Sequence, residues 1–344
     1  MLVYYVVLFF SSLLAFVSEV TKSKFLWIVS LLTVSFFAGL RYFVGIDYES
    51  YTFIFASISD SKTEPAFRII NLIIFFLGLN VQFVFLISSL ITFSLFYKGI
   101  KRYSDDVFLS VFLLLFCGIF IESLNIIRQY IAISIFFYGI KYIINKNLIK
   151  YIICIALATS FHYSAILLIL AYFVLNNNIG KLWFPILCVA YLLPFILPIQ
   201  SFFGLIPGYD AYFSSGNVIN NDANASAELG VGFLSKLLIG FSCLFYYDRI
   251  LRLSKESKLY LNGFFIYLFL LSFFRDFMVM VRLGYYFNVF LVLLIPKFFQ
   301  VFDKKTRLIL YILFIVYGFA ILLINLLDTQ AKLVPYNYQI NFFE

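Results

Sequence analysis

The sequence predicts an all-α protein that crosses a membrane several times. Of its 344 residues, 64% are hydrophobic and only 12% are charged, and the mean hydropathy is +1.01. An ordinary soluble domain carries about 25% charged residues. Apolar runs long enough to span a bilayer recur from one end of the chain to the other. These runs are continuous, whereas the strands of a membrane β-barrel would alternate apolar and polar residues.

The net charge of +8 does not indicate a nucleic-acid partner. The basic residues lie in short loops between apolar runs, which is the pattern that sets membrane topology. No basic face is long enough to follow a phosphate backbone. The four cysteines lie inside apolar segments without metal-ligand spacing, so buried thiols are favoured over a metal site or disulfide. The expected partner is therefore the lipid bilayer.

The chain is expected to form a single integral membrane domain over residues 1–344, with about 10 to 13 hydrophobic helical segments, some short, re-entrant or broken. The first segment lacks a positive region and a small-residue cleavage site, so it is interpreted as a helix rather than a signal peptide. The expected segments are 2–17, 25–40, 66–79, 83–98, 107–121, 128–144, 149–175, 183–203, 233–247, 259–274, 283–299 and 308–326.

Lysine and arginine in short loops predict the orientation of these segments. The basic loops, which are assigned to the cytoplasm, are 21–24, 98–102, 141–150, 248–258 and 303–307. The stretches assigned to the outside are 41–65, 122–128, 204–232, 275–282 and the tail after Leu327, with 41–65 and 204–232 as the two long outer loops.

This orientation requires two exceptions to simple counting of spans. Segment 66–79 has only fourteen residues, a length typical of a re-entrant or interfacial piece. Segment 149–175 is interrupted by polar residues around His162 and is expected to be two short helices that meet at the outer face. With both exceptions, the four polar clusters of the chain lie on one side of the membrane and can form one site. These clusters are residues 39–65, 125–129, 161–164 and 275–286.

Ionisable side chains next to apolar segments are costly, and they are functional candidates by default. Arg41 and Asp47 follow the second segment, with Gly39 and Gly45 expected to allow a tight turn. The arginine can hold an anion through its planar fork, and the carboxylate can act as a base. A structural ion pair between them is the alternative. Glu64 precedes Pro65 and is a candidate either for the site or for capping a short helix.

A second group of candidates lies further along the chain. Asn125, Arg128 and Gln129 offer several hydrogen-bond donors at an expected outer boundary, although an arginine there can simply reach the interface. His162 is the sole histidine and can carry a proton or donate to an anion, with a structural role as the alternative. Arg282 and the outer tyrosines, of which Tyr48 is one, can contact phosphate or sugar rings. No carboxylate cluster indicates a metal.

Four sequence blocks follow one another in order over almost the whole chain. They are Gly39-Leu-Arg-Tyr-Phe-Val-Gly-Ile-Asp-Tyr-Glu-Ser-Tyr with Glu64-Pro-Ala-Phe, then Asn125-Ile-Ile-Arg-Gln-Tyr-Ile-Ala, then Phe161-His-Tyr-Ser-Ala, and finally Val334-Pro-Tyr-Asn-Tyr, which contains Tyr336. Together these blocks resemble the EpsG family of Wzy-like bacterial polysaccharide polymerases. Position 46 is Ile where the family pattern has a polar residue.

The resemblance implies a glycosyltransferase of the bacterial plasma membrane with its active site on the outer side. A growing glycan would leave undecaprenyl pyrophosphate and join a lipid-linked repeat unit of an O-antigen, capsule or exopolysaccharide. No cofactor or metal is expected, and a chain-length regulator and a flippase are implied as partners. A GT-C-like architecture is compatible with this activity.

The resemblance also assigns roles to the candidate residues. Arg41, Arg128 and Arg282 would neutralise the leaving pyrophosphate. Asp47, with His162 or Glu64 as alternatives, would take the proton of the attacking hydroxyl. The other binding candidates are Tyr48, Asn125, Gln129 and Tyr336.

Three other functions stay open at this point. A transporter or flippase of lipid-linked sugars would place polar groups at the membrane midplane in paired repeats, which the sequence does not contain. A membrane O-acyltransferase could also use one histidine with arginines. A structural scaffold is disfavoured by the four polar clusters.

Overall fold

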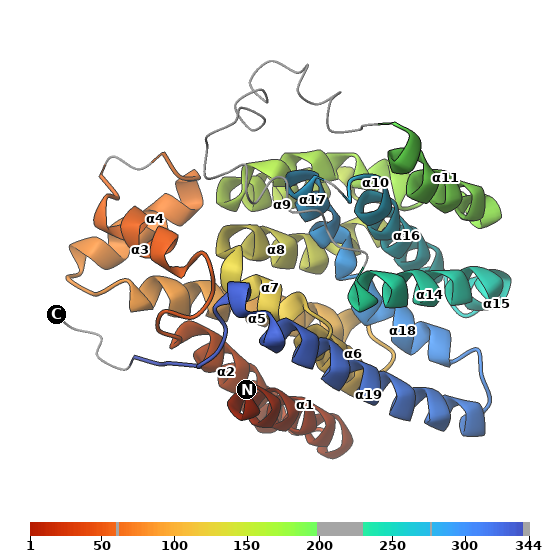
Figure 1. Cartoon of the computed structure of the whole chain (residues 1–344), viewed down its shortest axis with the longest axis horizontal. Helices are drawn as coiled ribbons and strands as arrows, with labels where there is room; N and C mark the ends of the chain where they lie inside the picture. Colours follow the sequence, from red (N-terminus) through yellow and green to blue (C-terminus); the bar gives the residue numbers. More distant parts are fainter. Residues whose placement is uncertain (60–61, 198–229, 276, 340–344) are drawn as a thin grey trace. The chain divides into compact units, whose positions relative to one another are not determined.

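The computed structural model describes residues 1–59, 62–197, 230–275 and 277–339 (Figure 1). Seventeen α-helices and a few 3₁₀ turns make up the regular structure of these residues, so the predicted all-α fold is confirmed. Within the described residues, one isolated antiparallel β-bridge joins Arg41 and Tyr338. Most of the predicted outer loop 204–232 lies outside the described residues.

The chain divides into two compact units, Met1–Tyr172 with Phe302–Glu344 and Phe173–Val301. The expected single membrane domain stays a prediction. The first unit contains α1 (Leu2–Thr21), α2 (Lys24–Gly39), α3 (Tyr48–Ala56), α4 (Pro65–Phe76), α5 (Gln82–Tyr103), α6 (Val107–Phe116), α7 (Ile119–Asn125), α8 (Ile127–Ile144), α9 (Leu148–Phe161), η1 (Tyr163–Ile169), α19 (Lys304–Leu327) and η4 (Thr329–Ala331).

The second unit begins within the short helix α10, which spans the division of the chain. Asn262 is fully buried in this unit and holds its parts together, because its side chain accepts from Trp183 Nε1 and donates to the carbonyl groups of Leu175 and Asn177. Its elements are α10 (Ala171–Val174), η2 (Gly180–Leu182), α11 (Trp183–Ile196), α14 (Val231–Phe245), α15 (Tyr247–Leu251), α16 (Ser257–Phe273), α17 (Met278–Asn288) and α18 (Leu291–Phe299).

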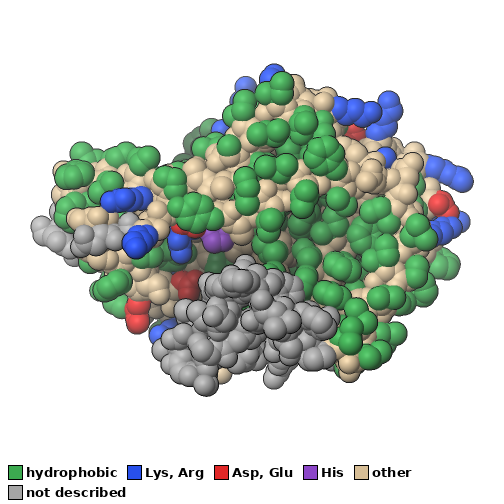
Figure 2. Space-filling model, turned by 90° about the horizontal axis from the view of Figure 1, so that it is seen from above, with side chains coloured by type: hydrophobic (Ala, Val, Ile, Leu, Met, Phe, Trp, Pro, Cys, Tyr) green, Lys and Arg blue, Asp and Glu red, His purple; other side chains and the backbone are tan. Residues whose placement is uncertain are grey.

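Four helices of the described chain, α1, α5, α8 and α19, are long and apolar enough to cross a membrane. Two bent pairs, α6 with α7 at 47° and α17 with α18 at 43°, raise this number to as many as six. The protein is thus a multi-pass membrane protein, and hydrophobic side chains cover much of the surface seen in Figure 2. The sequence predicts one helix over 107–121 and one over 283–299. Each of these predictions is wrong in one detail, because the structure has two helices joined at a bend in each place. The sequence analysis also missed α3.

Capping side chains explain where several helices begin. A side-chain oxygen that accepts a hydrogen bond from a free backbone N–H of the first turn stabilises a helix by about 1 kcal/mol. All four such caps lie in or beside the predicted cytoplasmic loops. They are Ser23 for α2, Asp106 for α6, Asn147 for α9 and Asp303 for α19.

The short helix α4 does not carry the chain across the first unit. Gln82, the first residue of α5, donates a hydrogen bond from Nε2 to the carbonyl oxygen of Gly39, the last residue of α2. The chain between these two residues therefore leaves and returns at the same end of the unit. The expectation that segment 66–79 is not a full span is confirmed.

Segment 149–175 is broken at His162, as expected. The backbone of His162 is extended, with φ −155° and ψ 116°, and ends α9. The chain then turns back along α9, because the Tyr151 hydroxyl group donates to the carbonyl oxygen of Leu168 at 2.6 Å. His162 is therefore at the tip of a helical hairpin.

Three of the predicted basic loops, 21–24, 98–102 and 141–150, lie at the end of the first unit opposite to Gly39 and Gln82. Lys101, near the end of α5, lies 5.2 Å from the ring of Trp27, in the first turn of α2. Tyr103 donates to the carbonyl oxygen of Tyr138, near the end of α8, at 2.7 Å. The separation of basic loops and polar clusters is thus confirmed within this unit, and the side of the membrane that each end faces stays a prediction.

The orientation can be tested with cysteines introduced at the two ends. Tyr338 and Asn145 are both exposed. We expect Tyr338→Cys to react with a membrane-impermeant maleimide in intact cells, and Asn145→Cys to react only after permeabilisation, because basic loops stay in the cytoplasm. The opposite labelling pattern would contradict the orientation.

Candidate functional site

Arg41 is buried at the end of α2 and is held by backbone carbonyl groups. Its side chain is 2% exposed. Nη1 donates to the carbonyl oxygen of Ala38 at 2.5 Å, Nη2 to that of Leu124 at 2.7 Å, and Nε to that of Val44 at 3.2 Å. Ala38 and Leu124 lie in the last turns of α2 and α7, where carbonyl groups are free and the helix dipoles are negative. The guanidinium group therefore joins two helix ends.

This arginine keeps its charge at neutral pH. Burial lowers the pKa of Arg41 to about 10, whereas the neighbouring phenol groups of Tyr336, Tyr48 and Tyr51 act in the opposite direction. The carbonyl oxygens provide the partners that a buried charge requires.

The two glycines of the first block have different roles. Gly45 has φ +98°, and a Cβ atom there would lie 2.6 Å from Asn125 Oδ1, so the predicted tight turn is confirmed at this residue. Asn125 Oδ1 accepts from the backbone N–H of Ile46 at 2.9 Å. Gly39 belongs to α2 instead, and a Cβ atom there would lie 2.7 Å from Cα of Leu86. The turn predicted at Gly39 is wrong, and this glycine allows close packing of α2 on α5.

Gln82 completes the support of this loop, and the sequence analysis missed it. The side chain is fully buried, and Nε2 donates to the carbonyl oxygens of Gly39 and Arg41. Tyr48 donates to Gln82 Oε1 at 3.3 Å and stacks on Phe85, with 4.6 Å between ring centroids. The Arg41 guanidinium lies 4.8 Å from the same ring. A glutamine at the start of an apolar segment was the available signal.

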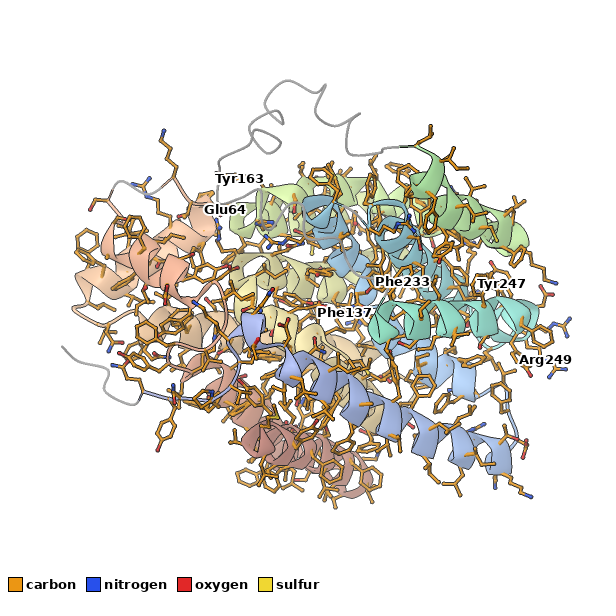
Figure 3. All side chains as sticks on the ribbon, in the orientation of Figure 1. Glu64, Phe137, Tyr163, Phe233, Tyr247 and Arg249 are labelled. Carbon is orange, nitrogen blue, oxygen red and sulfur yellow. The ribbon has the colours of Figure 1, made fainter. Side chains whose placement is uncertain are left out.

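Glu64 joins two residues that are far apart in the sequence. Its Oε2 accepts from Arg128 Nη1 at 2.5 Å, and its Oε1 lies 3.0 Å from His162 Nδ1. The side chain of Glu64 is 5% exposed, whereas those of Arg128 and His162 are each 28% exposed. Figure 3 shows Glu64 close to Tyr163, the residue after His162. The first three of the four sequence blocks therefore meet in one ion-pair cluster. We name it the Glu64 cluster (Glu64, Arg128 and His162).

The hydrogen bonds of this cluster orient the histidine ring. A carboxylate only accepts hydrogen bonds, so Nδ1 of His162 must carry the proton that it shares with Glu64. In the neutral ring, Nε2 then has a free lone pair. In Figure 2 the histidine side chain is visible on the surface, next to acidic and basic side chains. The cluster thus holds a proton acceptor, His162, and a cation, Arg128, on the two oxygens of one carboxylate.

Glu64 is strongly biased toward the ionised form. Burial acts to raise its pKa, but the hydrogen bond from His162 and the charge of Arg128 outweigh burial and lower the pKa to about 2. Glu64 is the N-cap residue of α4, although its side chain makes no capping hydrogen bond, so its position at the start of this helix is as predicted. The guanidinium group of Arg68 donates to the carbonyl oxygen of Ser59.

Aromatic rings connect the Glu64 cluster with the loop between α2 and α3, residues 40–47, which we name the Arg41 loop. The guanidinium of Arg128 lies 5.9 Å from the ring of Tyr51 and 6.0 Å from that of Phe67. Tyr51 contacts Phe67 and, on its other side, Phe85, which lies under Arg41. Buried rings therefore lie between the two guanidinium groups.

Other predicted site residues lie in several environments. Asp47 is half-buried at the start of α3, and Gln129 is buried one residue after Arg128. Tyr336 donates to the carbonyl oxygen of Phe37 and packs on its ring. Arg282 is half-buried on α17 of the second unit. Their roles stay predictions. Within the described residues, no group of three or more His, Cys, Asp or Glu side chains could hold a metal ion.

Comparison with known proteins decides the family. The model of the EpsG family matches residues 24–338, which includes all four sequence blocks. The chain belongs to the EpsG family. This family is implicated in exopolysaccharide biosynthesis. No curated protein and no solved structure matches the chain, so the GT-C-like architecture stays a prediction for this EpsG-family protein.

The low pKa of Glu64 predicts an acid-sensitive fold. A carboxyl group with a lowered pKa in the folded state stabilises that state above its unfolded pKa, and the contribution is lost as the pH falls toward the folded value. The change from 4.5 to about 2 corresponds to on the order of 3 kcal/mol.

We therefore expect Glu64→Gln to lower the melting temperature of the purified protein at pH 7. The difference from the wild type should shrink between about pH 4.5 and pH 2, where the wild type also loses this charge. A difference that does not change with pH would mean that the Glu64 charge does not stabilise the fold.

Proposed function

We propose that this EpsG-family protein is a polysaccharide polymerase. It transfers a growing glycan from undecaprenyl pyrophosphate onto a lipid-linked repeat unit at the outer face of the bacterial plasma membrane. The observation that supports this proposal is the Glu64 cluster, in which a histidine with a free Nε2 and a partly exposed arginine share one carboxylate. These are the groups that a glycosyl transfer needs.

The transfer uses His162 as the general base. A hydroxyl oxygen of the acceptor sugar attacks the anomeric carbon of the growing glycan, and the bond from that carbon to the pyrophosphate oxygen breaks. The hydroxyl proton moves to His162 Nε2. The leaving pyrophosphate takes the electron pair, and Arg128 stabilises its negative charge. The part of the Arg128 side chain that is exposed is available for this contact.

Glu64 is proposed as a positioning residue. Both of its oxygens are engaged, and its pKa of about 2 makes it a weak base at neutral pH. Its carboxylate holds the His162 ring in one tautomer and stabilises the imidazolium that forms, as in other carboxylate–histidine pairs.

Arg41 is proposed to act through the backbone. All three of its hydrogen bonds go to carbonyl groups, so contact with pyrophosphate would require breaking one of them. It fixes the end of α7, directly before the residues that lead to Arg128. Tyr48 and Asn125 support the same loop.

Gln129 and Arg282 keep the roles proposed from the sequence, whereas Asp47 is the competing candidate for the base. The transfer is proposed to need no metal, since arginines provide the positive charge. The partners are the lipid-linked oligosaccharide, a chain-length regulator and a flippase.

Glycan length in cells that lack the gene tests this function. We expect complementation with His162→Gln to yield mostly single repeat units, since loss of a general base costs about 10²-fold or more in rate. Arg128→Ala should do the same. Ser160→Ala, two residues before His162 on α9, and Lys141→Ala, at the far end of α8, are matched controls that should support full-length chains at equal membrane protein levels.

Other outcomes distinguish the competing functions. Asp47→Asn should support full-length chains; if it abolishes them and His162→Gln does not, Asp47 is the base. Unchanged chain length with loss of acetyl groups would indicate an acyltransferase. Loss of all outer-face glycan would indicate a transporter of lipid-linked sugars.

A further inference from the structure

The segment after α19 returns to the loop that carries Arg41. We name residues 328–339 the C-terminal strap. The backbone N–H of Tyr42 donates to the carbonyl oxygen of Asn337 at 2.9 Å, and that of Gln339 donates to the carbonyl oxygen of Leu40 at 3.0 Å. Further along, the N–H of Gly45 donates to the carbonyl oxygen of Lys332 at 3.0 Å. The strap therefore pairs with both sides of the Arg41 loop.

Two tyrosines hold the C-terminal strap against α1 and α2. The hydroxyl group of Tyr336 donates to the carbonyl oxygen of Phe37 at 2.5 Å, and its ring stacks on Phe37 with 4.3 Å between centroids. Tyr4, fully buried in α1, donates to the carbonyl oxygen of Leu333 at 2.8 Å and contacts the Tyr336 ring edge-on. Figure 1 shows the end of the chain running back past the start of α5.

The strap is also electrostatically coupled to Arg41. Burial raises the pKa of Tyr336, and the charge of Arg41 opposes this rise. Arg41 in turn holds the carbonyl oxygen of Leu124, beside Asn125 and one turn before Arg128. A displacement of the strap would therefore release the Arg41 loop and the start of α8.

We propose that Tyr336 is a positioning residue of the glycosyl-transfer site and that the C-terminal strap fixes the Arg41 loop. This proposal rests on the proposed polymerase function. Tyr336 acts through Phe37 and the loop rather than on the substrate, because its hydroxyl group is bound to a backbone carbonyl and its ring is packed between Phe37 and Tyr4.

Hydrogen exchange of the purified full-length protein tests the structural step. We expect Tyr336→Ala to speed exchange at least tenfold at Tyr42 and Gly45, in peptides that cover residues 40–46, because the N–H groups of these two residues bond to the strap. Tyr336→Phe, which keeps the stacking, should change exchange only a few-fold. Peptides from α9 should be unchanged in both variants. Tyr338→Ala is the matched control, since this strap side chain is 65% exposed.

Polymerisation kinetics with a lipid-linked repeat unit test the functional step. A positioning role predicts that Tyr336→Ala lowers kcat at least tenfold while KM stays within about twofold, and that Tyr336→Phe restores most of kcat. A raised KM in both variants, with unchanged exchange over 40–46, would show that Tyr336 binds substrate and would overturn the proposal. Faster exchange with unchanged kcat would overturn it as well.

Two further arms keep the test decisive. Should Tyr336→Ala fail to accumulate, Tyr4→Phe removes only the bond to Leu333 and should show the same changes in smaller measure. Should the wild type itself make no polymer, the proposed function fails, whereas the exchange result still shows whether the strap orders the loop.

Discussion

The burial of one positive charge constrains the first unit. A guanidinium group that leaves water needs several hydrogen-bond acceptors, and Arg41 finds them in the carbonyl groups of Ala38, Val44 and Leu124. Two of these carbonyls belong to helix ends, where they lack partners within the helix. The position of α7 relative to α2 thus follows from the need to pair this charge. The positive φ of Gly45 lets the loop close around the guanidinium group.

The Glu64 cluster also depends on how the helices of the first unit are placed. Glu64 precedes α4, Arg128 begins α8, and His162 ends α9, so three helix termini must meet for the cluster to form. The contacts of Tyr51 with Phe67 and Phe85 link this cluster to Arg41. In a region with little water, each ion pair is stronger than it would be at an exposed surface, which is the environment that charge stabilisation in a transfer reaction requires.

The sequence was most informative where polar residues interrupt apolar ones. The break at His162, the short α4 and the turn at Gly45 were all predicted, because each has a local cause: a polar run, a limited length or a glycine. The sequence could not predict that the guanidinium of Arg41 would bond to backbone carbonyls, since these acceptors carry no sequence signal. Gln82 differs, because a glutamine at the start of an apolar segment is a sequence signal that the analysis did not use.

The bends and the Glu64–His162 contact illustrate two other limits. The 47° bend between α6 and α7 lies in a continuous apolar run, where periodicity cannot place a break. The hydrogen bond between Glu64 and His162 joins residues 98 positions apart, and nothing in their spacing indicates that they are neighbours. Spacing along the chain indicates neighbours only when the helices between them are already placed.

The most direct measurement uses purified protein in lipid nanodiscs with a synthetic undecaprenyl-pyrophosphate repeat unit. Released undecaprenyl pyrophosphate and new glycosidic bonds would be counted together. The wild type should release one undecaprenyl pyrophosphate for each bond formed, and His162→Gln should lose both products because it lacks the general base. Equal turnover in His162→Gln would contradict the assignment of the Glu64 cluster as the site of glycosyl transfer.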